Sequence, residues 1–290
     1  WHNYNLFAEV ARSQSGGVGA VAGLLASISK RWDATFLFRH FDKNFHSFYS
    51  NAFSESSRNS NETGVYIGGK YTIHKKLKAG AYIDGYRFPW FRYLVDKKPT
   101  YGYDFLVQGT WTPSKKWAFY AIYRQEQKER NIASKLSKQK FVTNTNRHQL
   151  ILNTEYNASK VWSFRTRLQG STFAYKDFKV DKGWMILQEI NADLGKISAL
   201  LRLSIYNTDS YDSRQYAVER DVLYAVSMPA YYDYGFRNFL LIRYTPHART
   251  DIWIRFARTD MPNQKTLSSY VDEIDASHRS ELKLQVRHRF

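Results

Sequence analysis

The feature that most constrains this chain is a strict alternation of apolar and charged side chains in one short segment after another. Near the C-terminus, Leu282, Leu284 and Val286 alternate with charged and amide residues, and the pattern recurs around Arg202 and Arg255. Successive side chains of a β-strand point to opposite faces, so each segment has one apolar face and one polar face. Unpaired arginines are costly in a soluble core, whereas the wet interior of a membrane barrel accommodates them.

Short basic turns alternate with long polar loops along the chain. The turns are Ser29–Asp33, His74–Lys78, Pro113–Trp117, Asn157–Trp162, Leu194–Ile197 and Thr245–Thr250. The long loops include Asp42–Glu62, Gln127–Asn146 and Met261–His278. Short turns on one rim and long loops on the other are typical of outer-membrane barrels, and a soluble sandwich shows no such asymmetry.

The alternation and the turns together predict about fourteen strands. An even number returns both termini to the short-turn side, as in bacterial barrels. The segment Tyr216–Gly235 is also strand-like, but a further spanning strand would break the parity, so we expect a long outer loop that stands above the membrane or folds inward. The predicted strands lie near residues 3–12, 18–28, 33–41, 63–73, 77–88, 101–112, 116–126, 147–156, 161–173, 183–193, 197–207, 236–245, 251–260 and 280–290.

The predicted fold class is therefore all-β: a closed antiparallel transmembrane β-barrel of about fourteen strands, in a range of roughly 12 to 16, formed by residues 1–290 as a single domain. Aromatic residues make up 17% of the chain, as aromatic girdles at two membrane interfaces require. Mean hydropathy is −0.56 and no apolar run approaches about eighteen residues, which excludes a transmembrane helix. Cysteine is absent, so disulfides and thiolate chemistry are excluded. The net charge of +17 favours anionic partners without selecting one.

Three stretches carry a family resemblance: Ser50–Gly69, Asp84–Asp96 and Arg220–Tyr232. They resemble the C-terminal barrel of poorly characterised Gram-negative outer-membrane proteins whose N-terminal part carries helix-hairpin-helix modules. The resemblance covers essentially the whole chain but brings no catalytic signature. Helix-hairpin-helix modules grip the DNA backbone in soluble relatives. Since no such module is present in this sequence, DNA binding transfers to none of its residues.

The two ends of the chain carry further expectations. Phe290 resembles the C-terminal aromatic residue that the barrel-assembly machinery recognises in outer-membrane proteins, so the last strand is expected to act as an assembly signal. The chain begins at Trp1 without a signal peptide, so we expect a mature or trimmed product, with room for a preceding soluble domain that is missing from this chain.

The first candidate site is a ladder of basic residues predicted to line the lumen. Its members are Arg147, Arg165, Arg167, Arg202, Arg243, Arg255, Lys283, Arg287 and Arg289. Such a ladder lowers the barrier for carboxylate or phosphate and would make an anion-preferring pore. Alternatively, neighbouring acidic residues neutralise it into a network that stiffens the barrel while loops close the bore.

Two aromatic segments are the other candidates. The aromatic loop base consists of Pro89, Trp90, Phe91, Arg92 and Tyr93. It would grip sugars, bases or a partner protein, or form part of an interfacial girdle. The partner or plug segment consists of Val222, Leu223, Tyr224, Met228, Pro229, Tyr231 and Tyr232. It is too apolar for a solvated loop, so it is expected to fold into the bore or pack against another protein.

Nothing in the sequence indicates catalysis. The eight histidines are scattered without metal-site spacing or a nucleophile beside them, and the acidic loops lack EF-hand spacing. No catalytic residue, cofactor or metal ligand is predicted, and we expect a protein that is not an enzyme.

The predicted location is the outer membrane of a Gram-negative bacterium, crossed by multiple β-strands. The favoured function is an anchor or interaction scaffold within an envelope assembly, secretion or uptake complex, with the bore largely occluded. The alternative is a diffusion or translocation channel with a basic lumen for anionic solutes or DNA. Expected partners are outer-membrane lipid and lipopolysaccharide, the barrel-assembly machinery through the C-terminal strand, and envelope proteins. Nucleic acid is expected only through a missing domain or as translocated cargo.

Overall fold

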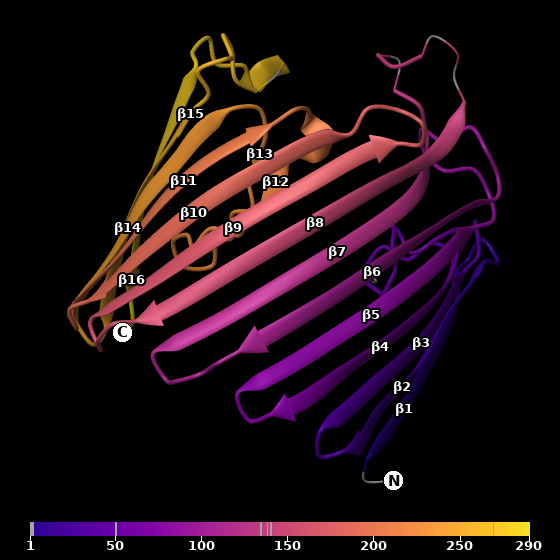
Figure 1. Cartoon of the computed structure of the whole chain (residues 1–290), viewed down its shortest axis with the longest axis horizontal. Coiled ribbons are helices and arrows are strands. Elements are labelled where there is room, and N and C mark those ends of the chain that lie inside the picture. The colour runs from indigo at the N-terminus through magenta and orange to yellow at the C-terminus, as the bar shows by residue number, and fades with distance from the viewer. Residues whose placement is uncertain (1–2, 50, 134, 138, 140, 269) are drawn as a thin grey trace. The chain divides into compact units, whose positions relative to one another are not determined.

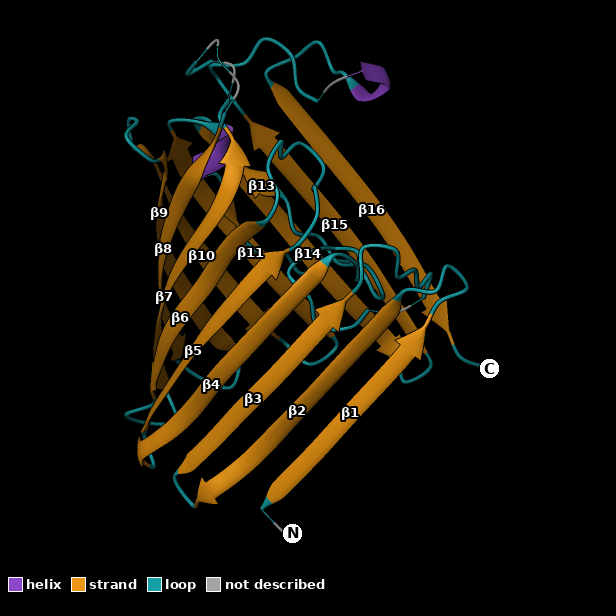
Figure 2. Ribbon diagram, turned by 90° about the vertical axis from the view of Figure 1, so that its right-hand side faces the viewer, coloured by secondary structure: helices purple, strands orange, loops and turns teal. Residues whose placement is uncertain are grey.

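The chain forms one large β-sheet. The structure, a computed structural model, describes residues 3–49, 51–133, 135–137, 139, 141–268 and 270–290. Fourteen strands follow one another in chain order, with β1 and β16 at the two ends of the order (Figure 1). Figure 2 shows β1 to β4 lying side by side. The strands are β1 (Tyr4–Arg12), β2 (Val18–Ser29), β3 (Trp32–Phe41), β4 (Glu62–His74), β5 (Leu77–Phe88), β6 (Thr100–Trp111), β7 (Trp117–Asn131), β8 (Val142–Asn157), β9 (Trp162–Tyr175), β10 (Asp181–Asp193), β11 (Ile197–Thr208), β14 (Gly235–His247), β15 (Thr250–Asp260) and β16 (His278–His288).

Three kinds of short element complete the described chain. β12 (Gln215–Tyr216) and β13 (Ala230–Tyr231) pair with each other in a separate two-stranded sheet. Two 3-10 helices, η1 (Tyr211–Ser213) and η2 (Tyr270–Asp272), lie in long loops. None of the described helices is long and apolar enough to cross a membrane.

The polar face of the sheet is buried and the apolar face is exposed, which inverts the arrangement of a soluble sheet. In β11, Arg202 and Ser204 are buried whereas Leu203 is exposed, and in β15, Arg255 is buried whereas Ile254 is exposed. The strand period of two places these residues on opposite faces, as the alternation predicts. Exposed apolar strands of this extent are typical of a surface that does not face water.

All fourteen predicted strands are confirmed, with one correction at the centre of the chain. Strands cover both ends of the predicted polar loop Gln127–Asn146, because β7 continues to Asn131 and β8 begins at Val142. Ion pairs stabilise this polar extension: Lys128 lies 3.3 Å from Glu126 and also pairs with Glu55. The sequence pattern did not predict this extension, because polar side chains occupy both faces of these strand ends and the apolar alternation is lost there.

The chain divides into two compact units. Unit 1 comprises Trp1–Trp111, Ile122–His148 and Phe173–Val180. Its buried aromatic residues include Phe41, stacked on Phe45 at 6.1 Å. Unit 2 comprises Thr112–Ala121, Gln149–Thr172 and Asp181–Phe290. Two small apolar clusters stabilise unit 2, one around Met185 and Tyr206 and the other at Leu200, Phe239 and Ala257.

Candidate functional site

The loop between β11 and β14, residues 209–234, folds as a hairpin against unit 2, and we call it the hairpin loop. Gln215 pairs with Tyr231 and Tyr216 with Ala230, and an isolated bridge joins Glu219 to Ser227. β12 of this loop lies against β10 (Figure 1). The two arms of the loop are therefore paired from Gln215 as far as Glu219, and the loop stays close to β10 of the large sheet.

The hairpin loop approaches the sheet without a gap. A Cβ atom built on Gly183 of β10 would lie 2.2 Å from the backbone oxygen of Ser213, so only glycine fits at that position. Ala217 and Tyr231 of the loop pack with Met185 and Leu187 of β10 and Tyr206 of β11. We call the strands of the large sheet the wall. The rings of Tyr206 and Tyr231 meet edge to face at 5.2 Å. This packing gives part of the apolar residues of the hairpin loop a place away from water.

Two carboxylates of the hairpin loop are buried among cations of the wall. Glu219 accepts hydrogen bonds from Arg237 Nε at 2.7 Å and Nη2 at 2.9 Å, and it also pairs with Arg255. Asp221 accepts a hydrogen bond from Lys283 Nζ at 2.5 Å and lies 3.8 Å from Arg255 Nε. The side chains of Glu219, Asp221 and Arg255 are completely buried. Buried charges persist only when paired, so these carboxylates and cations require one another.

The pKa values of both loop carboxylates keep them charged. Burial by itself would raise the pKa of Glu219, but hydrogen bonds from Arg237 and Tyr231 and the charge of Arg255 hold it below its ordinary value. Burial opposes ionisation of Asp221 as well, and the hydrogen bonds from Lys283 and the Val222 amide again lower the pKa. Two anions therefore stand against the basic wall at neutral pH.

Arginines of the wall also bind the backbone of the hairpin loop. Arg202 Nη2 donates to the Val218 carbonyl at 2.8 Å, while its Nε donates to Glu189 at 2.9 Å. Arg167 Nη2 donates to the Tyr216 carbonyl at 3.4 Å. These bonds satisfy loop carbonyls that β12 and β13 leave unpaired, as buried backbone groups require.

The members of the predicted basic ladder have two kinds of partner. Arg167, Arg202, Arg255 and Lys283 contact the hairpin loop, and Arg165, Arg202, Arg243, Arg255 and Arg287 pair with carboxylates of the strands. Arg165 bridges Glu155 at 2.7 Å and Glu189 at 3.3 Å. Arg147 lies on β8 in unit 1, and Arg289 lies beyond the end of β16, where it donates to the Ala248 carbonyl at 3.0 Å.

Three residues of this buried cluster are not among the predicted site residues: Glu219, Asp221 and Arg237. The signal that points to the first two is a pair of carboxylates, two positions apart, inside an apolar segment. Arg237 follows an aromatic cluster and has no distinctive signal, since its role depends on Glu219 being brought to it.

The predicted partner or plug segment is split between buried and exposed residues. Tyr231 is buried and donates to Glu219 at 2.8 Å. In contrast, the side chains of Tyr224, Val226 and Met228 are exposed by 89%, 83% and 60%. Val222, Leu223, Pro229 and Tyr232 are intermediate. The arms of the hairpin pack on the wall, while its tip presents apolar side chains.

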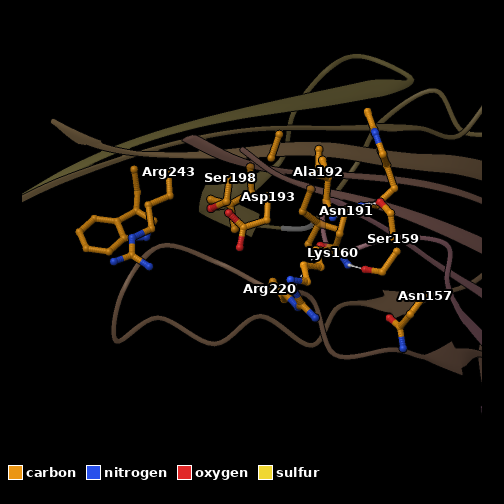
Figure 3. Close-up of a pocket in the computed structure, with 16 residues that line it drawn as sticks. Asn157, Ser159, Lys160, Asn191, Ala192, Asp193, Ser198, Arg220 and Arg243 are labelled. Atoms are coloured by element: carbon orange, nitrogen blue, oxygen red, sulfur yellow. Dashed lines mark hydrogen bonds between the residues drawn. The ribbon is translucent and has the colours of Figure 1, made fainter. Parts of the chain in front are cut away.

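A cavity of about 490 Å³ lies in unit 2 at the short-turn end of the strands (Figure 3). Arg220 of the hairpin loop enters it and donates to Asn191 Oδ1 at 3.2 Å. Lys160 and Arg243 bring further positive charge, and Asp193 is the one carboxylate among the described residues that line it. The cavity is therefore basic and lies beneath the loop.

The aromatic loop base lies at the opposite, long-loop end of unit 1, after β5. Pro89, Trp90, Phe91 and Tyr93 are exposed, and Arg92 is half-buried. Phe290 is fully exposed and its ring meets His288 edge to face at 5.0 Å. Among the described residues, no group of three or more histidines and carboxylates is arranged to hold a metal ion.

Comparison with known proteins identifies the fold. No family model and no curated protein sequence matches the chain. Solved structures do match. The FrpB iron transporter from Neisseria meningitidis aligns with a TM-score of 0.58 at 10% identity, over 89% of this chain and 46% of that one. The copper transporter OprC aligns with a TM-score of 0.57 at 10% identity, over 99% and 51%. The ferric yersiniabactin uptake receptor FyuA from Yersinia pestis aligns with a TM-score of 0.53 at 10% identity, over 99% and 52%.

These similarities confirm the fold class, the antiparallel outer-membrane β-barrel of about fourteen strands. The chain spans about half the length of the solved structures that it matches.

Proposed function

We propose that the protein spans the outer membrane of a Gram-negative cell with its charged face toward the barrel interior, and that the hairpin loop keeps this interior occluded at rest. The observation that carries the proposal is the burial of Glu219 and Asp221 among Arg237, Arg255 and Lys283. A solvated loop would not place two carboxylates in a dry site, because their desolvation is offset only by these partners. Such a barrel serves as an anchor or scaffold within an envelope or uptake complex.

The exposed tip of the hairpin loop supports the scaffold role. Tyr224, Val226 and Met228 expose large apolar side chains at alternate positions of the tip, and exposed apolar surface can mark contacts with other proteins. The similarity to uptake transporters supports a place in an uptake complex. Phe290 at the end of the last strand is proposed as the contact with the barrel-assembly machinery, since it is exposed and free to be recognised.

A channel for anionic solutes is the second candidate, favoured by the basic cavity beneath the loop. Arg220, Lys160 and Arg243 would receive a carboxylate or phosphate there. In this case the two loop carboxylates occupy the positions that a passing anion would take, and moving the loop would clear the path. The two candidates differ in one observable, the conductance of the parent protein.

Single-channel conductance in planar bilayers tests the proposal. We expect the parent protein to conduct little, and the double variant Glu219→Gln, Asp221→Asn to conduct, because the loop then loses its charge-assisted contacts. Deletion of Arg220–Tyr232 should conduct at least as well, since the wall strands remain. Glu273→Gln, in the exposed loop before β16, is the matched control and should behave as the parent. A large, steady conductance of the parent would support the channel and overturn the occluded scaffold.

A further inference from the structure

The long-loop end of unit 1 holds a second cavity, unrelated to the hairpin loop. Its volume is about 620 Å³, and it is lined by Lys43, by residues between 56 and 61, by Phe88 and by the aromatic loop base. Among the described residues that line it are the cations Lys43, Arg58 and Arg92 and no carboxylate. On the strands, by contrast, arginines such as Arg202 and Arg255 form ion pairs with carboxylates.

Aromatic rings contact two of these cations, Lys43 and Arg92, and also Lys98 beside the cavity. The Nζ atom of Lys98 lies 3.3 Å from the centre of the Trp90 ring, and that of Lys43 lies 4.1 Å from it. Arg92 lies over Phe88 at 4.2 Å. A carboxylate neutralises the cation that it binds, whereas the face of a ring positions a cation without cancelling its charge. The cavity thus retains its positive charge for a ligand.

Among the described residues, Arg92 has no carboxylate as a hydrogen-bond partner. Its Nη2 donates to the neutral Glu129 carbonyl at 2.8 Å, and its Nε is buried with no hydrogen-bond partner among the described residues. Burial lowers the pKa of this guanidinium below its ordinary value. An anion in the cavity would restore the stabilisation that solvent supplies to an exposed arginine.

The remaining lining groups suit a sugar. Ser56, Ser57 and Ser60 bring hydroxyl groups, and Phe91 and Tyr93 are exposed aromatic residues, with Lys98 Nζ 4.8 Å from the centre of the Phe91 ring. The cavity is also fixed in shape, because Asn61 accepts a hydrogen bond from the Trp90 amide at 2.7 Å and donates to the Trp90 carbonyl at 3.0 Å. Hydroxyl groups and flat apolar faces are the partners that a saccharide ring uses, and preorganised sites bind with less entropic cost.

We propose that this cavity binds an acidic sugar, that is, a saccharide that carries a phosphate or a carboxylate. The cations Lys43, Arg58 and Arg92 bind the acidic group, and the serines and rings bind the sugar. The site stands apart from the proposed occlusion by the hairpin loop, so either proposal can fail without the other. The acidic sugar comes from one of two sources: the anchored saccharide of lipopolysaccharide or a free solute.

Isothermal titration of the full chain in detergent tests the site, with glucose 6-phosphate, galacturonate and glucose as probes. We expect both acidic probes to bind and glucose to bind at least tenfold more weakly. The variant Lys43→Gln, Arg92→Gln should lose at least tenfold in affinity for the acidic probes, and added salt should weaken parent binding. Lys115→Gln, an exposed lysine in a short turn, is the matched control and should leave affinity unchanged. Circular dichroism and heat-modifiable migration verify that each variant is folded.

Equal binding of glucose and glucose 6-phosphate would overturn the proposal, as would unchanged affinity in the folded double variant or absence of binding at millimolar probe. A second titration compares lipopolysaccharide in mixed micelles with its delipidated oligosaccharide. Binding of the intact form alone identifies an anchored ligand, and equal binding identifies a free one. Both results support an acidic-sugar site only if the double variant weakens them.

Discussion

The two units each hold a long loop against the charged face, but they satisfy their arginines in different ways. In unit 1, Arg39 binds two carboxylates of the strands, Glu62 at 2.5 Å and Asp84 at 2.7 Å, so the wall neutralises itself. From the loop, Glu55 pairs with Lys128, which also lies 3.3 Å from Glu126. Removal of that loop carboxylate would leave no arginine without a partner.

In unit 2 the wall depends on the loop. Arg237 and Arg255 reach Glu219 closely, and their next carboxylate, Glu281, is 3.7 Å from each. Lys283 pairs with Asp221 of the same loop. The difference shows what holds a loop on a charged sheet: the loop is held more strongly where buried cations of the strands have its carboxylates as their main partners. The hairpin loop is therefore expected to be the better anchored of the two.

Removing one loop carboxylate should have the largest effect and tests this comparison first. Glu219→Gln leaves Arg237 and Arg255 buried without their main partner, so it should lower the free energy of unfolding by about 3–5 kcal/mol. Glu55→Gln in unit 1 should cost much less, because Lys128 keeps Glu126. Thermal unfolding in detergent, followed by circular dichroism, measures both. Equal costs would show that the wall of unit 2 does not depend on its loop.

The fold was predictable because alternation is a local property of the chain. Each strand carries its own pattern of faces, so all fourteen strands were predicted. The contacts of Glu219 with Arg237 and Arg255 were not predictable. These partners lie 18 and 36 positions away in the sequence, and no local pattern specifies the path of the loop that brings Glu219 to them. The exposed face of Leu203 and the buried face of Arg202 followed from the period of two, whereas the partners of Arg202 did not.

A charge on the exposed apolar face should have the next largest effect, and it should be alike in both units. Leu203→Arg in β11 and Ile67→Arg in β4 both place a cation where the proposal puts lipid, and each should cost about 2–4 kcal/mol if the site lies near the bilayer midplane. Refolding titrations into lipid vesicles measure the cost. Unchanged stability of either variant would contradict the proposed lipid face of that unit.

The close approach of the hairpin loop provides a smaller test. Gly183→Ala adds a Cβ that collides with the Ser213 backbone, so it should displace the start of the loop at a cost of about 1–3 kcal/mol. Gly109→Ala in β6 of unit 1 is the matched control, because a Cβ there meets no atom within 4 Å. Thermal unfolding compares them. If the two substitutions cost the same, the loop does not pack on β10 as described.

The smallest expected effect is a difference in pH dependence. Burial raises the pKa of Glu55 above 4.5, although Lys128 opposes the rise, so docking of the unit 1 loop should strengthen as pH falls through that raised value. The pKa of Glu219 lies below 4.5, so docking of the hairpin loop should be complete above 4.5 and weaken as pH falls toward the lowered value. Limited proteolysis of each loop from pH 3 to 7 measures docking. Parallel profiles would contradict the opposite signs.

The central claim is that the hairpin loop is held on the wall of unit 2 by its two buried carboxylates. The chain has no cysteine, so spin labels attach only at introduced sites: Tyr224→Cys at the exposed tip and Leu194→Cys in the turn between β10 and β11. Double electron–electron resonance in lipid nanodiscs should give one narrow distance distribution, which broadens and shifts in Glu219→Gln, Asp221→Asn. A broad distribution in the labelled parent, or an identical narrow one in the double variant, would contradict the account.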